Sequence, residues 1–249
     1  MSSSRWLLIP VSPLPRAKSR LKSVFSEEQL KNFTISLFKD FALKVSTIKA
    51  FENKLVYCTS PEILELAEEF GLIAIKEDKA NSNKTFDEVI EVFNDIAMKK
   101  YDATKTTLAF CDVILINRIN FIELSSLLKN NQLVICPAIN SGGVSILGRS
   151  PPDIIPTFFS HPTTPSLFAI VNEAKVKKLK FVIYDSFRSG FDIDIKQDLV
   201  LAYEYLKSLN MKDTNTFKFL QDNLKLTLLK KNVNDNRDLE LKEINSQLE

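Results

Sequence analysis

The chain has 249 residues, 45% of them hydrophobic, and carries 33 Lys and Arg against 31 Asp and Glu, a net charge of +2. This near-neutral charge excludes the strong basic bias of nucleic-acid-binding proteins, and no apolar run is long enough to span a bilayer. A single histidine, His161, excludes multi-histidine metal sites, and the five glycines form neither a GxGxxG nor a Walker phosphate loop.

The cysteines and the first residues indicate a reducing, cytoplasmic setting. The three cysteines, Cys58, Cys111 and Cys136, each lie inside an apolar run, which predicts buried thiols and neither a disulfide frame nor a metal knuckle. The first apolar run stops at Pro10 and is too short for a signal core, so we expect a cytoplasmic protein.

The first structured stretch predicts a buried strand that ends in a basic loop. Residues 7–11 form a short apolar run, and the three prolines between residues 10 and 15 prevent it from continuing as a strand or a helix. Ligands of open α/β sheets bind beyond the strand ends, so cations placed here suit a polyphosphate. A solvated loop is the alternative. The cations are Arg16, Lys18 and Arg20.

The following residues alternate between predicted helices and strands as far as residue 111. Ser26 with Gln29, and Thr85 with Glu88, form capping boxes that begin two helices. A helix between them begins at Pro61 and ends at Gly71. Short apolar runs predict the strands, which are residues 55–58, 72–75 and 107–111.

The second half continues the same alternation. Asn120 and Glu123 are expected to cap a short helix, and Ser166 precedes another. The remaining strands are expected at 133–136 and 181–184, and a last helix at 196–205. The pattern predicts an α/β fold, a doubly wound, mostly parallel sheet with helices on both faces. We expect this domain over residues 1–210, followed over 211–249 by a tail with a helical patch at 217–228 and an exposed polar end.

Three carboxylates follow predicted strands and are candidate metal ligands. Asp112 ends one apolar run, while Asp192 and Asp194 are two residues apart in extended backbone and so share a face. Oxygen ligands of this kind suit Mg²⁺ bound together with substrate phosphates. Turn and cap roles are the alternative, because Asp194 with Gln197 also forms a capping box.

Several of these segments together resemble the 2-phospholactate guanylyltransferase family, the CofC/FbiD proteins of coenzyme F420 biosynthesis. The resemblance covers about residues 6–206. It rests on Ile9-Pro10-Val11, Arg16 to Leu21, Asp112 with Leu115, the Gly142-Gly143 pair with Leu147, Ser166, and the D-I-D-x-x-x-D-L pattern that begins at Asp192. The chain departs from the family pattern at Ser12, Ile114, Val144 and Ser145, and residues 84–87 replace a GLN-type segment.

The resemblance implies a GT-A-like nucleotidyltransferase that uses Mg²⁺ to join GTP and 2-phospholactate, or phosphoenolpyruvate, with release of pyrophosphate. It implies that Asp112, Asp192 and Asp194 hold the metal and that Lys18 and Arg20 are catalytic. The implied nucleotide-binding residues are Pro10, Val11, Arg16, Lys18, Arg20 and Lys84. The implied substrate-binding residues are Gly143, Val144, Thr163 and Ser166.

Two other functions remain open at this point. One is another nucleotidyltransferase of the same fold, acting on a sugar phosphate or a molybdopterin. The other is a catalytically inactive paralogue that binds a nucleotide, which the departures from the family pattern favour. A homodimer is also open, whereas nucleic acid and membrane partners are not expected.

Overall fold

The computed structural model describes residues 4–14, 18–78, 81 and 83–244. Their contacts divide the chain into two compact units: unit 1 comprises residues 1–13 and 41–192, and unit 2 comprises residues 14–40 and 193–249. The expected boundary at residue 210 does not coincide with this division, since residues 14–40 group with the C-terminal part. No helix of the described residues is both long and apolar enough to cross a membrane.

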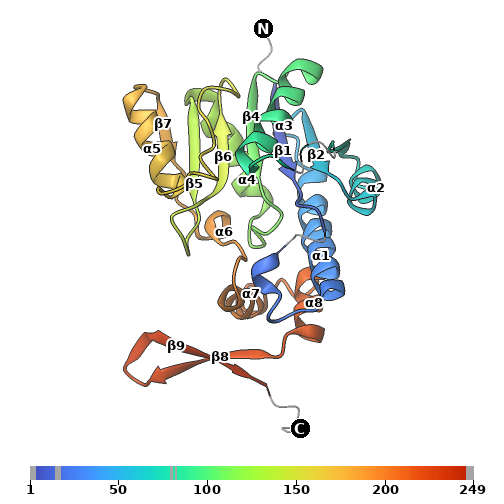
Figure 1. The fold of residues 1–249 in the computed structure, drawn as a ribbon, viewed down its shortest axis with the longest axis vertical. Coiled ribbons are helices and arrows are strands. Elements are labelled where there is room, and N and C mark those ends of the chain that lie inside the picture. The colour runs from blue at the N-terminus through green and yellow to red at the C-terminus, as the bar shows by residue number, and fades with distance from the viewer. Residues whose placement is uncertain (1–3, 15–17, 79–80, 82, 245–249) are drawn as a thin grey trace. The chain divides into compact units, whose positions relative to one another are not determined.

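Unit 1 is built on a seven-stranded sheet in the order β3-β2-β1-β4-β6-β5-β7 (Figure 1). Every neighbouring pair is parallel except the two that include β6. This confirms the mostly parallel α/β fold. The strands are β1 (Arg5–Pro10), β2 (Asn53–Cys58), β3 (Ile73–Lys76), β4 (Lys105–Ala109), β5 (Leu133–Pro137), β6 (Val144–Arg149) and β7 (Phe181–Ile183).

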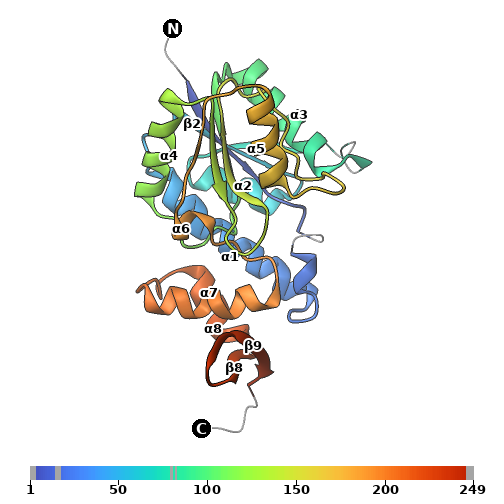
Figure 2. The ribbon, with the colours of Figure 1, turned by 90° about the vertical axis from the view of Figure 1, so that its left-hand side faces the viewer.

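Helices cover both faces of this sheet, as the sequence pattern predicts (Figure 2). On one face lie α3 (Phe86–Tyr101) and α5 (Ser166–Val176), and the Phe93 ring of α3 stacks on Tyr57 of β2 with centroids 4.8 Å apart. On the other lies α4 (Arg118–Asn130), whose Phe121 makes an edge contact with Phe41 at 5.6 Å. Unit 1 also contains α2 (Pro61–Glu69) and the short α6 (Phe187–Gly190).

Two of the predicted capping boxes form in the structure, and in two others different residues cap the helix. The Ser26–Gln29 and Thr85–Glu88 boxes both form. The α4 box joins Asn117 to Asn120 and not Asn120 to Glu123, so the helix begins earlier than expected. At α7 (Lys196–Ser208) the carboxylate of Asp198 accepts from the backbone N–H groups of residues 194 and 195, both at 2.9 Å, in place of an Asp194–Gln197 box.

Unit 2 contains η1 (Ser19–Leu21), the first part of α1 (Glu27–Ser46), α7, and α8 (Asn215–Asn223). Phe219 of α8 contacts Phe25 and Phe33, with ring centroids 5.3 and 5.2 Å apart. The Asp40 carboxylate accepts from the backbone N–H groups of Asn215 and Thr216 at 2.8 and 2.7 Å, which fixes the start of α8.

The helical patch of the tail ends earlier than expected, and the described residues after it are mostly exposed. The helix ends at Asn223, and β8 (Leu226–Asn232) and β9 (Asp235–Glu243) then form an antiparallel hairpin. The physical reason is that apolar residues recur at every second position here, which is the period of a β-strand. Leu226 and Leu228 share one face of β8, and Leu239 and Leu241 share one face of β9.

Candidate functional site

The carboxyl ends of the parallel strands of unit 1 bring together several predicted site residues. Leu8 of β1 pairs in parallel with Leu108 of β4, so Pro10 and Asp112 both follow at the same edge of the sheet. The backbone N–H of Val11 donates to the carbonyl of Tyr57 at 2.9 Å, which continues the pairing beyond β1. Pro10, Val11 and Asp112 therefore share the edge at which open α/β sheets bind ligands.

The turn after Asp112 is held by its own backbone and by two cationic side chains. The N–H of Ile114 donates to the carbonyl of Asp112 at 2.9 Å, a bond that the proline of the family pattern could not form. Lys44 Nζ donates to the carbonyl of Ile114 at 2.6 Å, and Arg188 Nη1 to that of Leu115 at 3.3 Å. Local sequence patterns gave no sign of Lys44 or Arg188, because both act across long sequence separations.

Hydrogen bonds hold helix α6, and with it the segment before Asp192, at the same edge. The Ser145 hydroxyl of β6 lies 2.7 Å from the carbonyl of Ser189, and the N–H of Ile139 donates to the carbonyl of Gly190 at 2.8 Å. Through Arg188, α6 also reaches the turn that follows Asp112. The structure thus brings Asp112 and Asp192 to one edge of unit 1.

Sequence analysis missed a further carboxylate, Asp185, which acts on the same thiol as Asp192. Burial raises the pKa of the Cys136 thiol to about 11, and the charges of Asp185 and Asp192 both add to this shift. Both carboxylates therefore lie near the end of β5. The sequence did contain a signal for Asp185, because this residue directly follows an apolar run. The same pattern made Asp112 a candidate site residue.

The two segments expected to bind the substrate meet beside this edge. The N–H of Leu167 in α5 donates to the carbonyl of Gly142 at 3.1 Å, and a methyl group at Gly142 would lie only 2.7 Å from Pro165 Cβ. Gly143 and Val144 are therefore close in space to Ser166. Val144 is 6% exposed and packs in the core, while Ser166 is the first residue of α5, with Pro165 at the cap position.

Hydrogen bonds within the loop before α5 hold its conformation. Nδ1 of His161 accepts from the backbone N–H groups of Thr163 and Thr164, at 3.4 and 3.0 Å. The only histidine therefore shapes the loop that carries Thr163, which fits a structural role.

Lys84 is exposed and lies in a segment fixed to the end of β2. Its backbone N–H donates to the carbonyl of Asn81 at 3.0 Å, and the Asn81 side chain donates to the Tyr57 hydroxyl at 2.9 Å. This anchors Lys84 to unit 1 near the strand ends.

The predicted basic loop lies in unit 2, where its cations meet a carboxylate. Lys18 Nζ lies 3.3 Å from Asp194 Oδ1 and also donates to the carbonyl of Ile193, while Arg20 Nη1 lies 3.4 Å from Asp194 Oδ2. Arg16 lies outside the described residues. Two predicted phosphate-binding cations thus pair with a predicted metal ligand.

The metal-binding role of the carboxylates stays a prediction. Within the ranges that the structure describes, no three His, Cys, Asp or Glu side chains gather as a ligand set. Asp112 and Asp192 offer the hard oxygen ligands that Mg²⁺ prefers and share one edge, so these two fit the ion.

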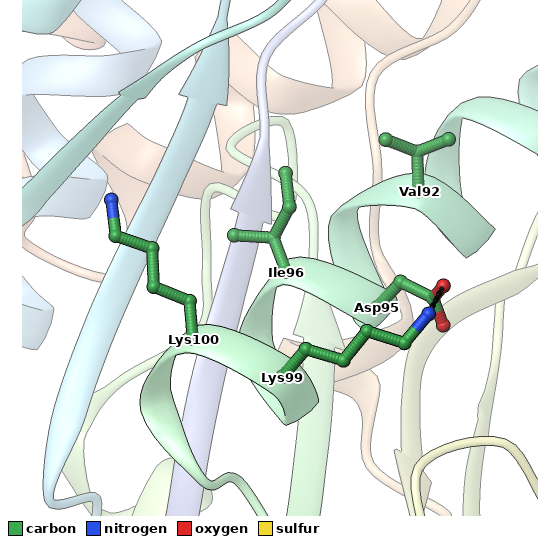
Figure 3. Close-up of a pocket in the computed structure, with 5 residues that line it drawn as sticks. All are labelled: Val92, Asp95, Ile96, Lys99 and Lys100. Atoms are coloured by element: carbon green, nitrogen blue, oxygen red, sulfur yellow. Dashed lines mark hydrogen bonds and ion pairs between the residues drawn. The ribbon is translucent and has the colours of Figure 1, made fainter.

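A shallow groove of about 450 Å³ lies away from this edge, along the second half of α3 (Figure 3). Its lining residues all belong to that helix: Val92, Asp95, Ile96, Lys99 and Lys100. Lys99 and Asp95 pair with each other, and none of the predicted site residues is among the five. The groove is therefore separate from the candidate site.

Comparisons with known proteins show which proteins this chain is similar to. The family model "Guanylyl transferase CofC like" matches residues 5–239. A 2-phospho-L-lactate guanylyltransferase from Methanocaldococcus jannaschii is 29% identical over 217 residues, covering 82% of this chain and 89% of the relative. One from Methanobrevibacter ruminantium is 27% identical and covers 83% and 92%.

Solved structures support the fold. A candidate nucleotide-diphospho-sugar transferase from Desulfovibrio desulfuricans G20 superposes with a TM-score of 0.70 at 15% identity, covering 90% of this chain and 96% of that one. A cytidylyltransferase from Leptospira borgpetersenii superposes with a TM-score of 0.53 at 17% identity, covering 88% and 91%. At these identities the likeness shows the nucleotidyltransferase-like α/β fold alone.

Proposed function

Since the chain belongs to the family of CofC-like guanylyl transferases, we propose that it joins GTP and a small phosphorylated acid with release of pyrophosphate. The acid is 2-phospholactate or phosphoenolpyruvate, and the reaction is a cytoplasmic step of coenzyme F420 biosynthesis. The observation that carries the proposal is the gathering of Pro10, Asp112, Asp192 and the Gly142–Ser166 segments at one edge of the mostly parallel sheet, where its parallel strands end.

The reaction exchanges one phosphoanhydride bond for another. A phosphate oxygen of the acid attacks the α-phosphorus of GTP, and the bond from that phosphorus to the bridging oxygen breaks, so that pyrophosphate leaves with its electron pair. No oxidant or reductant is needed. Such transfers depend mainly on alignment and charge neutralisation, which fixed side chains at a strand edge can provide.

Asp112 and Asp192 are the residues that would hold Mg²⁺, which when bound neutralises charge on the triphosphate. Asp194 differs from these two because Lys18 and Arg20 already balance its charge. We assign Lys18 and Arg20 to the triphosphate, as the family resemblance implies.

The start of α5 suits the anionic groups of the acid. An α-helix N-terminus carries a partial positive charge, and Ser166 is the first residue of α5, while the N–H of the next residue, Leu167, already donates to the carbonyl of Gly142. Val144 offers no hydroxyl, and the neighbouring Ser145 hydroxyl lies within hydrogen-bond distance of the carbonyls of Cys136 and Ser189. Fewer side-chain donors therefore face the acid here than the family pattern implies.

A pyrophosphate-release assay tests the proposal. The purified chain is incubated with each of four NTPs and each of three acids, namely 2-phospholactate, phosphoenolpyruvate and 3-phosphoglycerate, with Mg²⁺ or with EDTA. Release with GTP and one of the first two acids, lost in EDTA, is expected. A sugar phosphate is added as a further acceptor, and turnover with it instead would assign another nucleotidyltransferase. GTP binding without turnover would assign an inactive paralogue. Light scattering of the same sample determines whether the chain forms a homodimer.

A further inference from the structure

Three phenylalanine rings from separate segments cluster at the strand edge of unit 1. Phe86 is the first residue of α3, Phe110 follows β4 directly, and Phe159 lies in the loop before α5. Their centroids are 5.6 to 6.0 Å apart in all three pairs. The Phe86 residue is 39% exposed, so the cluster presents an open aromatic surface to solvent.

The backbone on both sides of Phe86 is fixed. Thr85 and Glu88 form a reciprocal capping box across it. The carboxylate of Asp87 accepts from the backbone N–H groups of Phe159 and Ser160, at 2.8 and 2.7 Å, and from the Thr157 hydroxyl. Asp87 thereby ties the loop that carries Phe159 to the start of α3. The aromatic surface is held in place before any ligand arrives, which lowers the entropic cost of binding.

The cluster lies beside the strand ends at which the proposed function places the nucleotide. Phe110 precedes Asp112 by two residues at the end of β4, beside the end of β1 at Pro10. Exposed Lys84 precedes Phe86 by two residues. The rings therefore adjoin the edge of unit 1 that holds Pro10 and Asp112.

Charge indicates which part of a nucleotide fits this surface. The first turn of α3 carries Asp87 and Glu88, and this negative charge disfavours a phosphate. An uncharged planar base has no such conflict and can stack on an aromatic face.

We propose that the open ring of Phe86, backed by Phe110 and Phe159, is the stacking surface for the purine base of the nucleotide. This inference rests on the proposed function, because it assigns one part of that same site. Stacking strengthens binding of either purine, since both present an extended π-face. Selection of guanine over adenine then depends on polar groups at the edge of the base.

The test measures binding by titration calorimetry in Mg²⁺ with three probes: GTP, ATP and inorganic tripolyphosphate, which has no base. Phe86→Ala and Phe86→Leu should weaken GTP and ATP binding by about tenfold and leave tripolyphosphate binding unchanged. Phe86→Trp should keep purine affinity. Leu retains the apolar bulk, so it separates stacking from packing if the Ala variant is unstable. Ile122→Ala, an exposed apolar residue of α4 on the opposite face of the sheet, is the matched control.

The probes separate the two ways in which the idea can fail. Unchanged GTP affinity in Phe86→Ala and Phe86→Leu, or an equal loss for tripolyphosphate, overturns the stacking role while the proposed function stands. Wild-type protein that binds tripolyphosphate but neither purine nucleotide overturns both.

Discussion

The ammonium group of Lys18 and the carboxylate of Asp194 are 176 residues apart in the sequence and form an ion pair, with 3.3 Å between Nζ and Oδ1. Lys18 also donates to the carbonyl of Ile193, and its side chain is only 14% exposed. Arg20 reaches the other oxygen of the same carboxylate with a side chain that is 71% exposed. Two cations that look equivalent in the sequence therefore differ in environment.

We predict that Lys18→Ala lowers the free energy of unfolding by about 1–2 kcal/mol, because the carbonyl of Ile193 and one oxygen of Asp194 lose their ammonium donor. Arg20→Ala should change it by less than about 0.5 kcal/mol, as is usual for an exposed pair. Urea denaturation of both variants measures this, and an Asp194→Ala background shows whether the Lys18 effect comes from the pair. Equal losses for the two substitutions would contradict the assignment.

Asp112→Asn and Asp192→Asn should each reduce Mg²⁺-dependent pyrophosphate release by about 100-fold or more, because charge stabilisation at the transferring phosphate is lost. Neither change should destabilise the protein without ligand, since removing one negative charge from the edge relieves repulsion. Melting temperatures with and without Mg²⁺-GTP accompany the assay. Asp95→Asn, at the α3 groove, is the control. If the variants keep the rise in melting temperature that Mg²⁺-GTP causes, the two carboxylates are only turn residues.

Gly142→Ala should disturb the junction between the Gly142-Gly143 turn and α5. The added methyl group meets Pro165 Cβ at 2.7 Å, so the two segments must separate, at a cost of about 1–3 kcal/mol in stability. The KM for the phosphorylated acid should rise more than that for GTP. In Gly143→Ala the nearest atom is the rotatable Ser141 Oγ at 3.0 Å, so its stability loss should be smaller. A larger loss for Gly143→Ala would show that the junction is not tightly packed.

The thiols should differ in reactivity in the folded protein. Burial raises the pKa values of Cys58 and Cys136 from their usual 9.0 to about 11, whereas Cys111 is half-buried. The thiolate is the reactive form, so iodoacetamide at pH 8 should label Cys111 first, as peptide mass spectrometry can determine. Rapid labelling of Cys136 would show that β5 is not closely packed.

These raised pKa values also predict a dependence of stability on pH. Because the folded state disfavours the thiolates, their contribution to stability is present below about pH 9 and is lost as the pH rises toward 11. Chemical denaturation between pH 8 and 11 should show this loss, and replacing both cysteines with Ala should reduce it.

Much of unit 1 was predictable because its signals are local. The Thr85–Glu88 box forms as predicted, since a cap and its partner are three residues apart. The strand of residues 144–149 was not predicted. Its glycine-rich approach indicated a turn, and its antiparallel position between β4 and β5 depends on pairing with distant residues.

Side-chain partners were harder to predict than elements. Asp194 was predicted to bind a metal, with a cap of α7 as the alternative, but Asp198 caps the helix and Asp194 pairs with Lys18. An aspartate suits a cap, an ion pair and a metal equally well, so residue type and spacing could not choose among them.

The sequence by itself determined the alternating strands and helices, the mostly parallel sheet and the appearance of Asp112 at a strand end, because periodicity and capping act over a few residues. Only the tertiary structure decided that Lys18 meets Asp194, that Arg188 reaches the turn after Asp112, and that Phe86 gathers with Phe110 and Phe159. Such contacts depend on how whole elements pack, and the free energy that selects them comes from burial across the sheet and not from any local pattern.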